Sequence, residues 1–372
     1  MNQNSRIALS LVLITGQYLF GQIDAHATIS TMADDNVNNN ALYLKSNVTT
    51  VMVNGGYDWE RDQTLTRLFY DGAFAYYESL LERTNQLHSV NAEFTQWYGN
   101  DGQNSVQAGG FIGAAIHRDT YTIFDHSMLS AFINTKYFLT DRLIGKAGYT
   151  LRAVSFTTLD DFSYTEHALF AHAAFAAAPT TTVIVQADLG SKFYSTTPSM
   201  SSASMRRGVM SSLMPSVTQT IGTVKIGQGI TENIGISITE RYQWNLQKQT
   251  RYLSAEYGYI SDDELFDDHY GYEGLHSNAV LTALLSETMT LKFSGGLQNK
   301  LYSSLAAYDL NGNYIDAQRS DERSYINISL LRNFDDLGIS VKGSAEYIQN
   351  NSNDALYHYT NTAFTLELGI PF

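Results

Sequence analysis

The end of the chain, from Leu356 to Phe372, alternates between apolar and polar positions with a period of two. One face carries Phe364, Leu366, Leu368, Ile370 and Phe372, and the opposite face carries Asn361, Ala363, Thr365, Glu367 and Gly369. Successive side chains of a β-strand point to opposite faces, so this period predicts a strand. We expect its apolar face and its polar face to meet different environments.

The same alternation recurs along most of the chain. It is clearest in the segments 106–116, 183–190, 234–239, 289–298 and 337–347. A single segment of this kind is weak evidence. A dozen or more in succession, with no helical stretch between them, predict an all-β protein.

The connections between these strands alternate between short turns and longer polar segments. Short turns are expected at 99–104, 139–142, 177–180, 231–233, 286–289 and 333–336. Longer connections are expected at 79–86, 119–126, 157–164, 195–214, 261–274, 306–322 and 350–355. This alternation is typical of a transmembrane up-and-down antiparallel β-barrel, which has short turns at one end and long loops at the other.

The strand count follows from the same pattern. Strands begin near 64, 87, 104, 128, 142, 165, 180, 216, 231, 275, 288, 322, 336 and 357, which makes fourteen. The segments 23–34 and 48–59 add two more, so we expect about sixteen strands, an even number as in most such barrels. The alternative is a barrel of fourteen strands with the first hairpin outside it.

The composition agrees with strands that have one face in lipid and one in water. Charged residues make up only 16% of the chain, whereas tyrosine (25), phenylalanine (18) and glycine (27) are abundant. The net charge of −14 argues against a nucleic-acid partner, because no basic surface is available to meet phosphates. The chain has no cysteine, which excludes disulfides and thiolate metal sites.

Residues 1–21 are expected to form a secretory signal peptide. Arg6 supplies the positive charge, and 7–20 supplies an apolar run too short to span a membrane as a helix. We prefer cleavage after Gly21 to cleavage after Ala27, because the second site would cut into the strand expected at 23–34. Residues 22–372 then form a single β-barrel domain.

The last strand, 366–372, ends on the aromatic residue Phe372. It resembles the C-terminal signature of Gram-negative outer-membrane β-barrel proteins of porin-like architecture, with no named subfamily indicated. The resemblance implies a location in the outer membrane, contact with its lipid and lipopolysaccharide, and recognition of Phe372 by the barrel assembly machinery. It implies no cofactor. Aromatic residues near strand ends look like interfacial girdles, namely Tyr57, Trp59, Trp97, Tyr98, Tyr137, Phe138, Phe193, Tyr194, Tyr242 and Trp244.

Charged residues on the polar faces are expected to line the interior, because a charge that faces lipid costs roughly 2–4 kcal/mol near the midplane. The candidates are Arg67, Asp71, Glu93, Lys136, Lys146, Arg152, Asp188, Lys192, Arg241, Lys292, Lys342, Glu346 and Glu367. They form either a pore lining that filters solutes by charge or ion pairs inside a blocked barrel. Four of them make a basic patch for anions, which Glu166 and Asp188 would partly neutralise: Lys136, Lys146, Arg152 and Lys192.

The connection 261–276 is acidic, and its clustered oxygens would suit calcium. Because no EF-hand spacing is present, we favour a solvated external loop and expect no metal site. The Asn-Gly pair within 309–313 is interpreted as a turn at a loop tip.

Three functions are compatible with such a barrel. A porin-like passive channel for small solutes is favoured, because about sixteen strands enclose a lumen too wide for side chains to fill. The second is a non-conducting barrel that binds a partner or supports assembly through its loops. A membrane-embedded enzyme has the least support, since the sequence has no Gly-x-Ser-x-Gly motif and we assign no catalytic residue. The histidines His88, His117, His126, His167, His172 and His269 are scattered along the chain.

Deletion of Phe372 should lower the yield of folded protein in cells and increase its degradation, because this residue completes the apolar face of the last strand. Folded yield can be measured as the heat-modifiable band in detergent gels of outer-membrane fractions. Equal yields of the deleted and intact chains would argue against recognition through this terminus.

Overall fold

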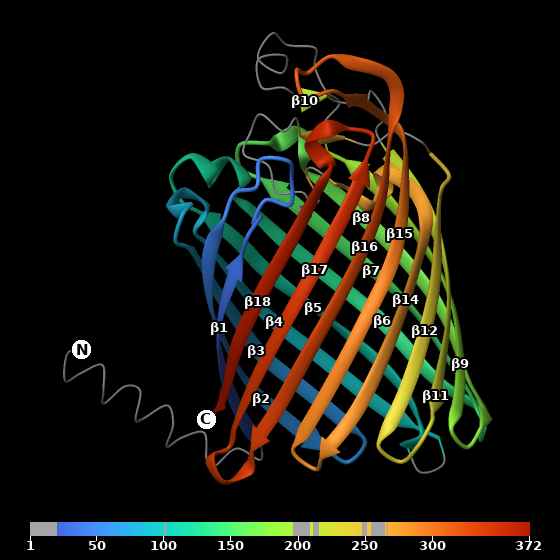
Figure 1. Cartoon of the computed structure of the whole chain (residues 1–372). Coiled ribbons are helices and arrows are strands. Elements are labelled where there is room, and N and C mark those ends of the chain that lie inside the picture. The colour runs from blue at the N-terminus through green and yellow to red at the C-terminus, as the bar shows by residue number, and fades with distance from the viewer. Residues whose placement is uncertain are drawn as a thin grey trace.

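The computed structural model of the protein describes residues 21–99, 102–195, 209–210, 216–247, 251–253, 265 and 267–372. The expected signal peptide, except for Gly21, lies outside these residues. Within them, sixteen antiparallel strands close into a barrel, each pairing with its neighbours along the chain (Figure 1). The strands are β1 (Gly21–Asp34), β2 (Ser46–Arg61), β3 (Thr64–Tyr77), β4 (Asn85–Tyr98), β5 (Asn104–His117), β6 (His126–Thr140), β7 (Leu143–Phe156), β8 (Tyr164–Ala178), β9 (Thr181–Tyr194), β11 (Ser216–Gly229), β12 (Ile234–Asn245), β14 (Tyr272–Ser286), β15 (Met289–Tyr308), β16 (Tyr314–Phe334), β17 (Ile339–Ser352) and β18 (Tyr359–Pro371). Two short strands, β10 (Val209–Met210) and β13 (Tyr252–Leu253), pair only with each other.

The barrel closes between its first and last strands. β1 pairs with β18 from His26, opposite Pro371, to Asp34, opposite Ala363, and it pairs with β2 along its whole length. The first hairpin therefore belongs to the barrel, which confirms sixteen strands and excludes the fourteen-stranded alternative. Closure leaves no strand edge with unpaired backbone groups in lipid, where such groups cost several kcal/mol each, roughly.

The hairpin of β15 and β16 is longer than the sequence predicts. The expected connection at 306–322 is wrong in its bounds, because β15 continues to Tyr308 and β16 begins at Tyr314. The turn between them is held by the Asp309 carboxylate, which accepts hydrogen bonds from the backbone N–H groups of Asn311 and Asn313. Gly312 takes a φ of +77°, which a glycine adopts without strain. The polar residues of this segment form a hairpin that projects beyond the neighbouring strands (Figure 1).

Short turns and long connections lie at opposite ends of the barrel, as predicted (Figure 1). β1 begins and β18 ends at the short-turn end, which in barrels of this type faces the periplasm. The short 3-10 helices of the long connections are η1 (Leu81–Arg83), η3 (Asp119–Phe124), η4 (Asp160–Phe162), η6 (His269–Gly271) and η8 (Ala355–Tyr357), and η7 (Asp335–Leu337) lies in a short turn. No helix in the described residues is long and apolar enough to cross a bilayer.

The register of the strands separates an apolar convex face from a polar concave face. Ile238 pairs with Ile226 and Ala279, and this row continues outward-facing through Gly295 and Ile326. Large apolar side chains on the convex face are solvent-exposed in the isolated chain, for example Phe293 at 47%. Seven of the expected girdle aromatics face outward, but Trp97, Phe138 and Tyr194 face inward because neighbouring residues of a strand point to opposite sides.

The long connections fold back over the external mouth of the barrel. Phe124 of η3, Phe162 of η4 and the loop residue Leu265 form an apolar cluster with Val154 and Tyr164 of the wall. This packing fixes connections that come from distant parts of the sequence against one side of the lumen.

Replacing Lys292 by glutamate should leave folding largely intact, because this side chain faces the lumen next to Phe293 on the convex face. Replacing Phe293 by lysine should instead cost roughly 2–4 kcal/mol, because the new charge meets lipid near the midplane. Lys342→Glu and Val341→Lys form a second matched pair on β17. The free energy of unfolding in lipid vesicles measures both, and stability lost only in the Lys→Glu variants would reverse the assignment of the two faces.

Candidate functional site

The segment that precedes β14 folds into the lumen rather than out into solvent. Its helix η6 lies against the inner surfaces of β11 and β12, where three neutral amides hold its backbone. The Nε2 of Gln243 donates to the carbonyl oxygens of His269 (2.5 Å) and Tyr272 (2.7 Å), and the Nε2 of Gln219 donates to His269 (2.6 Å). The Nδ2 of Asn245 donates to the carbonyl of Tyr270 at 2.8 Å. These bonds satisfy the backbone of η6 inside the barrel, as a buried turn requires.

Tyr270 anchors η6 on the adjacent strands. Its hydroxyl oxygen lies where a Cβ on Gly190 would stand, so the glycine permits the close approach. Its hydroxyl donates to the Oε1 of Glu166 at 2.6 Å. Burial and the Glu166 charge raise the pKa of Tyr270 far above its usual value, so the tyrosine stays neutral and acts as a donor.

A buried ion pair adds a second anchor. The Nζ of Lys192 lies 2.7 Å from the Oδ2 of Asp268, and both side chains are only 2% exposed. The Lys192 ammonium also lies over the rings of Tyr164 (4.3 Å) and Tyr270 (5.1 Å). Asp268 in turn accepts a hydrogen bond from the backbone N–H of Tyr270, so it caps η6.

The preceding residue, Asp267, makes a third anchor on β15, four strands away from β9 around the barrel. Its carboxylate binds the ammonium of Lys300 and the hydroxyl of Tyr302, both on β15. Burial alone would raise the pKa of Asp267, but the charges of Lys300 and Arg319 outweigh burial and lower it. Arg319 forms its own buried ion pair with Asp321. The segment is therefore tied to several strands of one side of the barrel wall, from β8 to β15.

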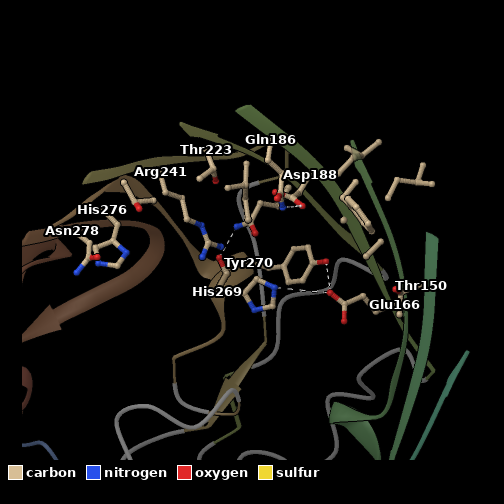
Figure 2. A pocket seen from close by; sticks show the side chains of 18 of the residues that line it. Thr150, Glu166, Gln186, Asp188, Thr223, Arg241, His269, Tyr270, His276 and Asn278 are labelled. Atoms are coloured by element: carbon tan, nitrogen blue, oxygen red, sulfur yellow. Dashed lines mark hydrogen bonds and ion pairs between the residues drawn. The ribbon is translucent and has the colours of Figure 1, made fainter. Parts of the chain in front are cut away.

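A chamber with a volume of about 660 Å³ lies beside η6 within the barrel (Figure 2). Glu166 and Asp188 reach it from β8 and β9, and Arg241 and His276 reach it from β12 and β14 (Figure 2). Neutral polar groups complete the lining, among them Thr150, Gln186, Thr223, Asn278 and Tyr325. Within the chamber, Asn278 donates to the hydroxyl of Tyr325 at 2.6 Å. The chamber thus presents two carboxylates on one side and the guanidinium of Arg241 with the imidazole of His276 on the other.

The register places all thirteen charged candidates from the sequence on the concave face. Nine contact another polar side chain there. Arg67 pairs with Asp58, Lys192 with Asp268, Arg152 with Glu166, and Lys342 with Glu367. Asp71, Glu93, Asp188 and Glu346 accept hydrogen bonds from Asn91, Gln107, Gln186 and Asn327 respectively.

Four cations remain without such a partner among the described residues. Lys136 lies over the ring of Phe138, and it stands directly opposite Lys146 in the register of β6 and β7. Lys146, Arg241 and Lys292 form no ion pair or hydrogen bond with the described residues. Lys192 differs from all of these, because η6 covers it and removes it from the open lumen.

The interpretation of 261–276 as a solvated external loop is wrong for the residues that can be described. Asp267 and Asp268 are buried in ion pairs, since Lys300 on β15 and Lys192 on β9 reach them. No group of three or more His, Asp or Glu side chains in the described residues is arranged to hold a metal ion. Asp262, Asp263 and Glu264 lie outside the described residues. Sequence reasoning missed Gln219, Gln243, Asn245 and Tyr270, because polar strand residues and a loop tyrosine give no signal until the segment folds inward.

Comparison with known proteins finds similar structures but no similar sequences. No protein-family model and no curated protein matches the sequence. OprD of Pseudomonas aeruginosa has a TM-score of 0.52 at 9% identity, with 94% of this chain and 95% of that chain covered. A bacterial polysaccharide outer-membrane secretin has a TM-score of 0.51 at 10% identity, with coverage of 94% and 98%. Pseudomonas aeruginosa OpdK, solved with vanillate, has a TM-score of 0.51 at 9% identity, with coverage of 95% and 99%.

These similarities and the apolar convex face agree on the class of protein. The chain has the fold of the porins, a closed β-barrel of sixteen antiparallel strands, as the sequence predicts. At this level of identity the comparison establishes the fold, and the activity has to be argued from the lumen.

Replacing Asp268 by asparagine should cost about 3–5 kcal/mol, because it leaves the Lys192 ammonium buried without a counter-charge. The double variant Lys192→Met/Asp268→Leu should recover most of the loss, since it removes both charges. The free energy of unfolding in detergent micelles measures this. Glu367→Gln is the control: its pair with Lys342 is long (3.7 Å) and partly exposed, so it should cost less than about 1 kcal/mol. Equal losses in Asp268→Asn and Glu367→Gln would contradict the role of the buried pair.

Proposed function

We propose that this barrel is a passive outer-membrane channel for small hydrophilic solutes, and that solutes are discriminated in the luminal chamber. Arg241 is the observation that carries the proposal. Its side chain opens into the chamber, and none of the described residues forms an ion pair or hydrogen bond with it. A half-buried charge without a partner is costly, so a charge that stabilises no part of the fold is most simply explained by a solute that meets it.

The distribution of luminal charge supports the same proposal. The strands β1–β4 carry Asp24, Asp58, Asp71 and Glu93 on the concave face, with Arg67 as the cation among them. Halfway round the barrel, β11–β15 carry Lys225, Arg241 and Lys292, and no described residue of these strands adds an inward-facing carboxylate. Opposed walls of this kind create a field across the lumen that favours charged or dipolar solutes.

The pair Lys136 and Lys146 also supports the proposed channel. Like charges placed directly opposite each other on neighbouring strands destabilise a sheet. They are tolerated here on the concave face, where they add to the cationic side of the lumen. In this channel an anionic group of a solute would contact Arg241, and an ammonium group would contact Asp188 or Glu166. OpdK, which shares the fold, was solved with vanillate, a small carboxylate anion.

We also propose partners that follow from the location. The amide of Phe372 donates to the carbonyl of Ala25, and its side chain is 79% exposed, so it is accessible to the barrel assembly machinery. Outer-membrane lipid and lipopolysaccharide would cover the convex face. We propose no nucleic-acid partner, because the chain carries a net charge of −14, and we assign no catalytic residue.

A second candidate function, binding of a surface partner, is favoured by one feature. The tip of the β15–β16 hairpin projects above the other strands and exposes Leu310 (81%), Tyr314 (53%) and Ile315 (42%). Large apolar side chains exposed at a projecting tip are available to an interaction partner. This candidate would replace the channel if the barrel proves not to conduct.

Single-channel recording in planar bilayers tests the channel. The intact protein should conduct, and Arg241→Glu should shift the reversal potential in a salt gradient towards cation selectivity, because the sign of the chamber charge changes. Lys45→Glu makes the same change of charge in an exposed external connection and should shift the potential much less. An absence of conductance in folded protein would reject the channel in favour of surface binding. Equal shifts in the two variants would remove Arg241 from the solute path.

A further inference from the structure

The convex face of the barrel carries a groove that neither the lumen nor the loops explain. It has a volume of about 580 Å³ and runs across β12, β14, β15, β16 and β17, on the front wall in Figure 1. Its floor is made of small residues, Ala279 and Gly295. Its borders are the exposed apolar side chains Ile238, Leu297, Ile326 and Tyr347. This volume falls within the roughly 300–1,000 Å³ typical of small-molecule sites.

The carboxylate of Glu240 lines this groove on the lipid-facing side of the wall. Glu240 shares the convex face of β12 with Ile238, towards the short turns, and with Tyr242 and Trp244, towards the external end. It therefore lies in the external half of the apolar belt, just inside the aromatic residues at the interface. Of the described residues, only Ser277 donates a hydrogen bond to it, from Oγ to Oε2 at 2.6 Å. An acidic group at this depth is unfavourable in plain hydrocarbon, so it requires a donor from the occupant of the groove.

The groove is polar at its external end. Ser324 and Gln349 line it there, and Asn299, Glu322 and Asn351 follow on the same face towards the long connections. The site therefore offers an apolar floor, acceptors slightly below the interface and a polar rim above. This order matches an amphiphile that lies with its chains along the wall and its headgroup outward.

A second copy of this chain is a poorer match to the carboxylate. Among the described strands, the outward-facing basic side chains are Arg61 and Arg332, both beside the short turns at the opposite end. The outward-facing histidines His88 and His167 already bond to Tyr70 and Tyr149, each at 2.7 Å. No outward-facing cation of the described strands of a neighbouring barrel would stand at the level of Glu240.

We propose that this groove binds a lipid of the external leaflet whose acyl chains carry hydroxyl or amide groups close to the headgroup. One chain lies over Ala279 and Gly295, and its hydroxyl or amide group donates to the free oxygen of Glu240. The lipid A part of lipopolysaccharide has chains of this kind, whereas ordinary phospholipids do not. The site is independent of the proposed channel, because it lies on the other side of the barrel wall.

Native mass spectrometry of the purified, delipidated protein tests the site, with lipid A and phosphatidylethanolamine as alternative probes. The intact protein should retain lipid A in preference to phosphatidylethanolamine. Glu240→Leu should lower lipid A retention about tenfold, the usual scale for one hydrogen bond to a charged group. Ala279→Trp should lower it at least as much by filling the groove. Ala131→Trp is the matched control, an outward-facing alanine on β6 away from the groove, and should retain lipid A normally.

Three results would overturn the proposal. The first is unchanged retention of lipid A in both groove variants, provided that heat-modifiable mobility shows them to be folded. The second is equal retention of phosphatidylethanolamine and lipid A by the intact protein, which would remove the role of the hydroxyl and amide groups. The third is a change of oligomeric state in Ala279→Trp but not in Ala131→Trp, which would assign the groove to a second copy of the chain. None of these results depends on whether the barrel conducts.

Discussion

The pairing of β1 with β18 is the interaction on which the rest of the structure depends. In lipid no water is available to bond an exposed backbone, so a sheet is stable there only when its first and last strands meet. The continuous ladder from His26–Pro371 to Asp34–Ala363 meets this requirement. Once the cylinder is closed, each strand has one face in lipid and one in the lumen, and the position of every charged residue follows from its register.

Closure of sixteen strands creates a second problem, since the lumen is too wide for wall side chains to fill. In this barrel a loop segment fills part of the lumen. The segment contains η6, and it is held by amides from β11 and β12, by Lys192 on β9 and by Lys300 on β15. The anchors differ in kind. Neutral amides satisfy the backbone of η6, while the two buried ion pairs fix Asp267 to β15 and Asp268 to β9. What remains open beside η6 is the chamber with Arg241 on one side and Glu166 on the other.

On both faces of the barrel wall, the notable residue is a charged side chain that its neighbours do not satisfy. Inside, cations without partners among the described residues stand out, because most of the luminal charges are satisfied by neighbours. Outside, Glu240 stands out because its strand is otherwise apolar or aromatic on that face. On each face, a charge that stabilises no neighbouring strand indicates a ligand. We propose a solute as the ligand of Arg241 and a lipid as the ligand of Glu240.

The sequence by itself determined the class of fold, a count of about sixteen strands, the order of short and long connections, and the inward face of the thirteen charged candidates. It could do so because the period of two is a local property, and because lipid penalises any other arrangement of Lys292 beside Phe293 or Lys342 beside Val341. It misjudged the β15–β16 hairpin, where the polar residues 314–322 continue a strand above the membrane. Only the tertiary structure decided that Asp267 and Asp268 are buried, that Lys192 is covered, and that Arg241, Glu166 and Tyr270 share one chamber. These contacts join residues far apart in the chain, on strands whose curvature and shear bring them together, and no local pattern records that geometry.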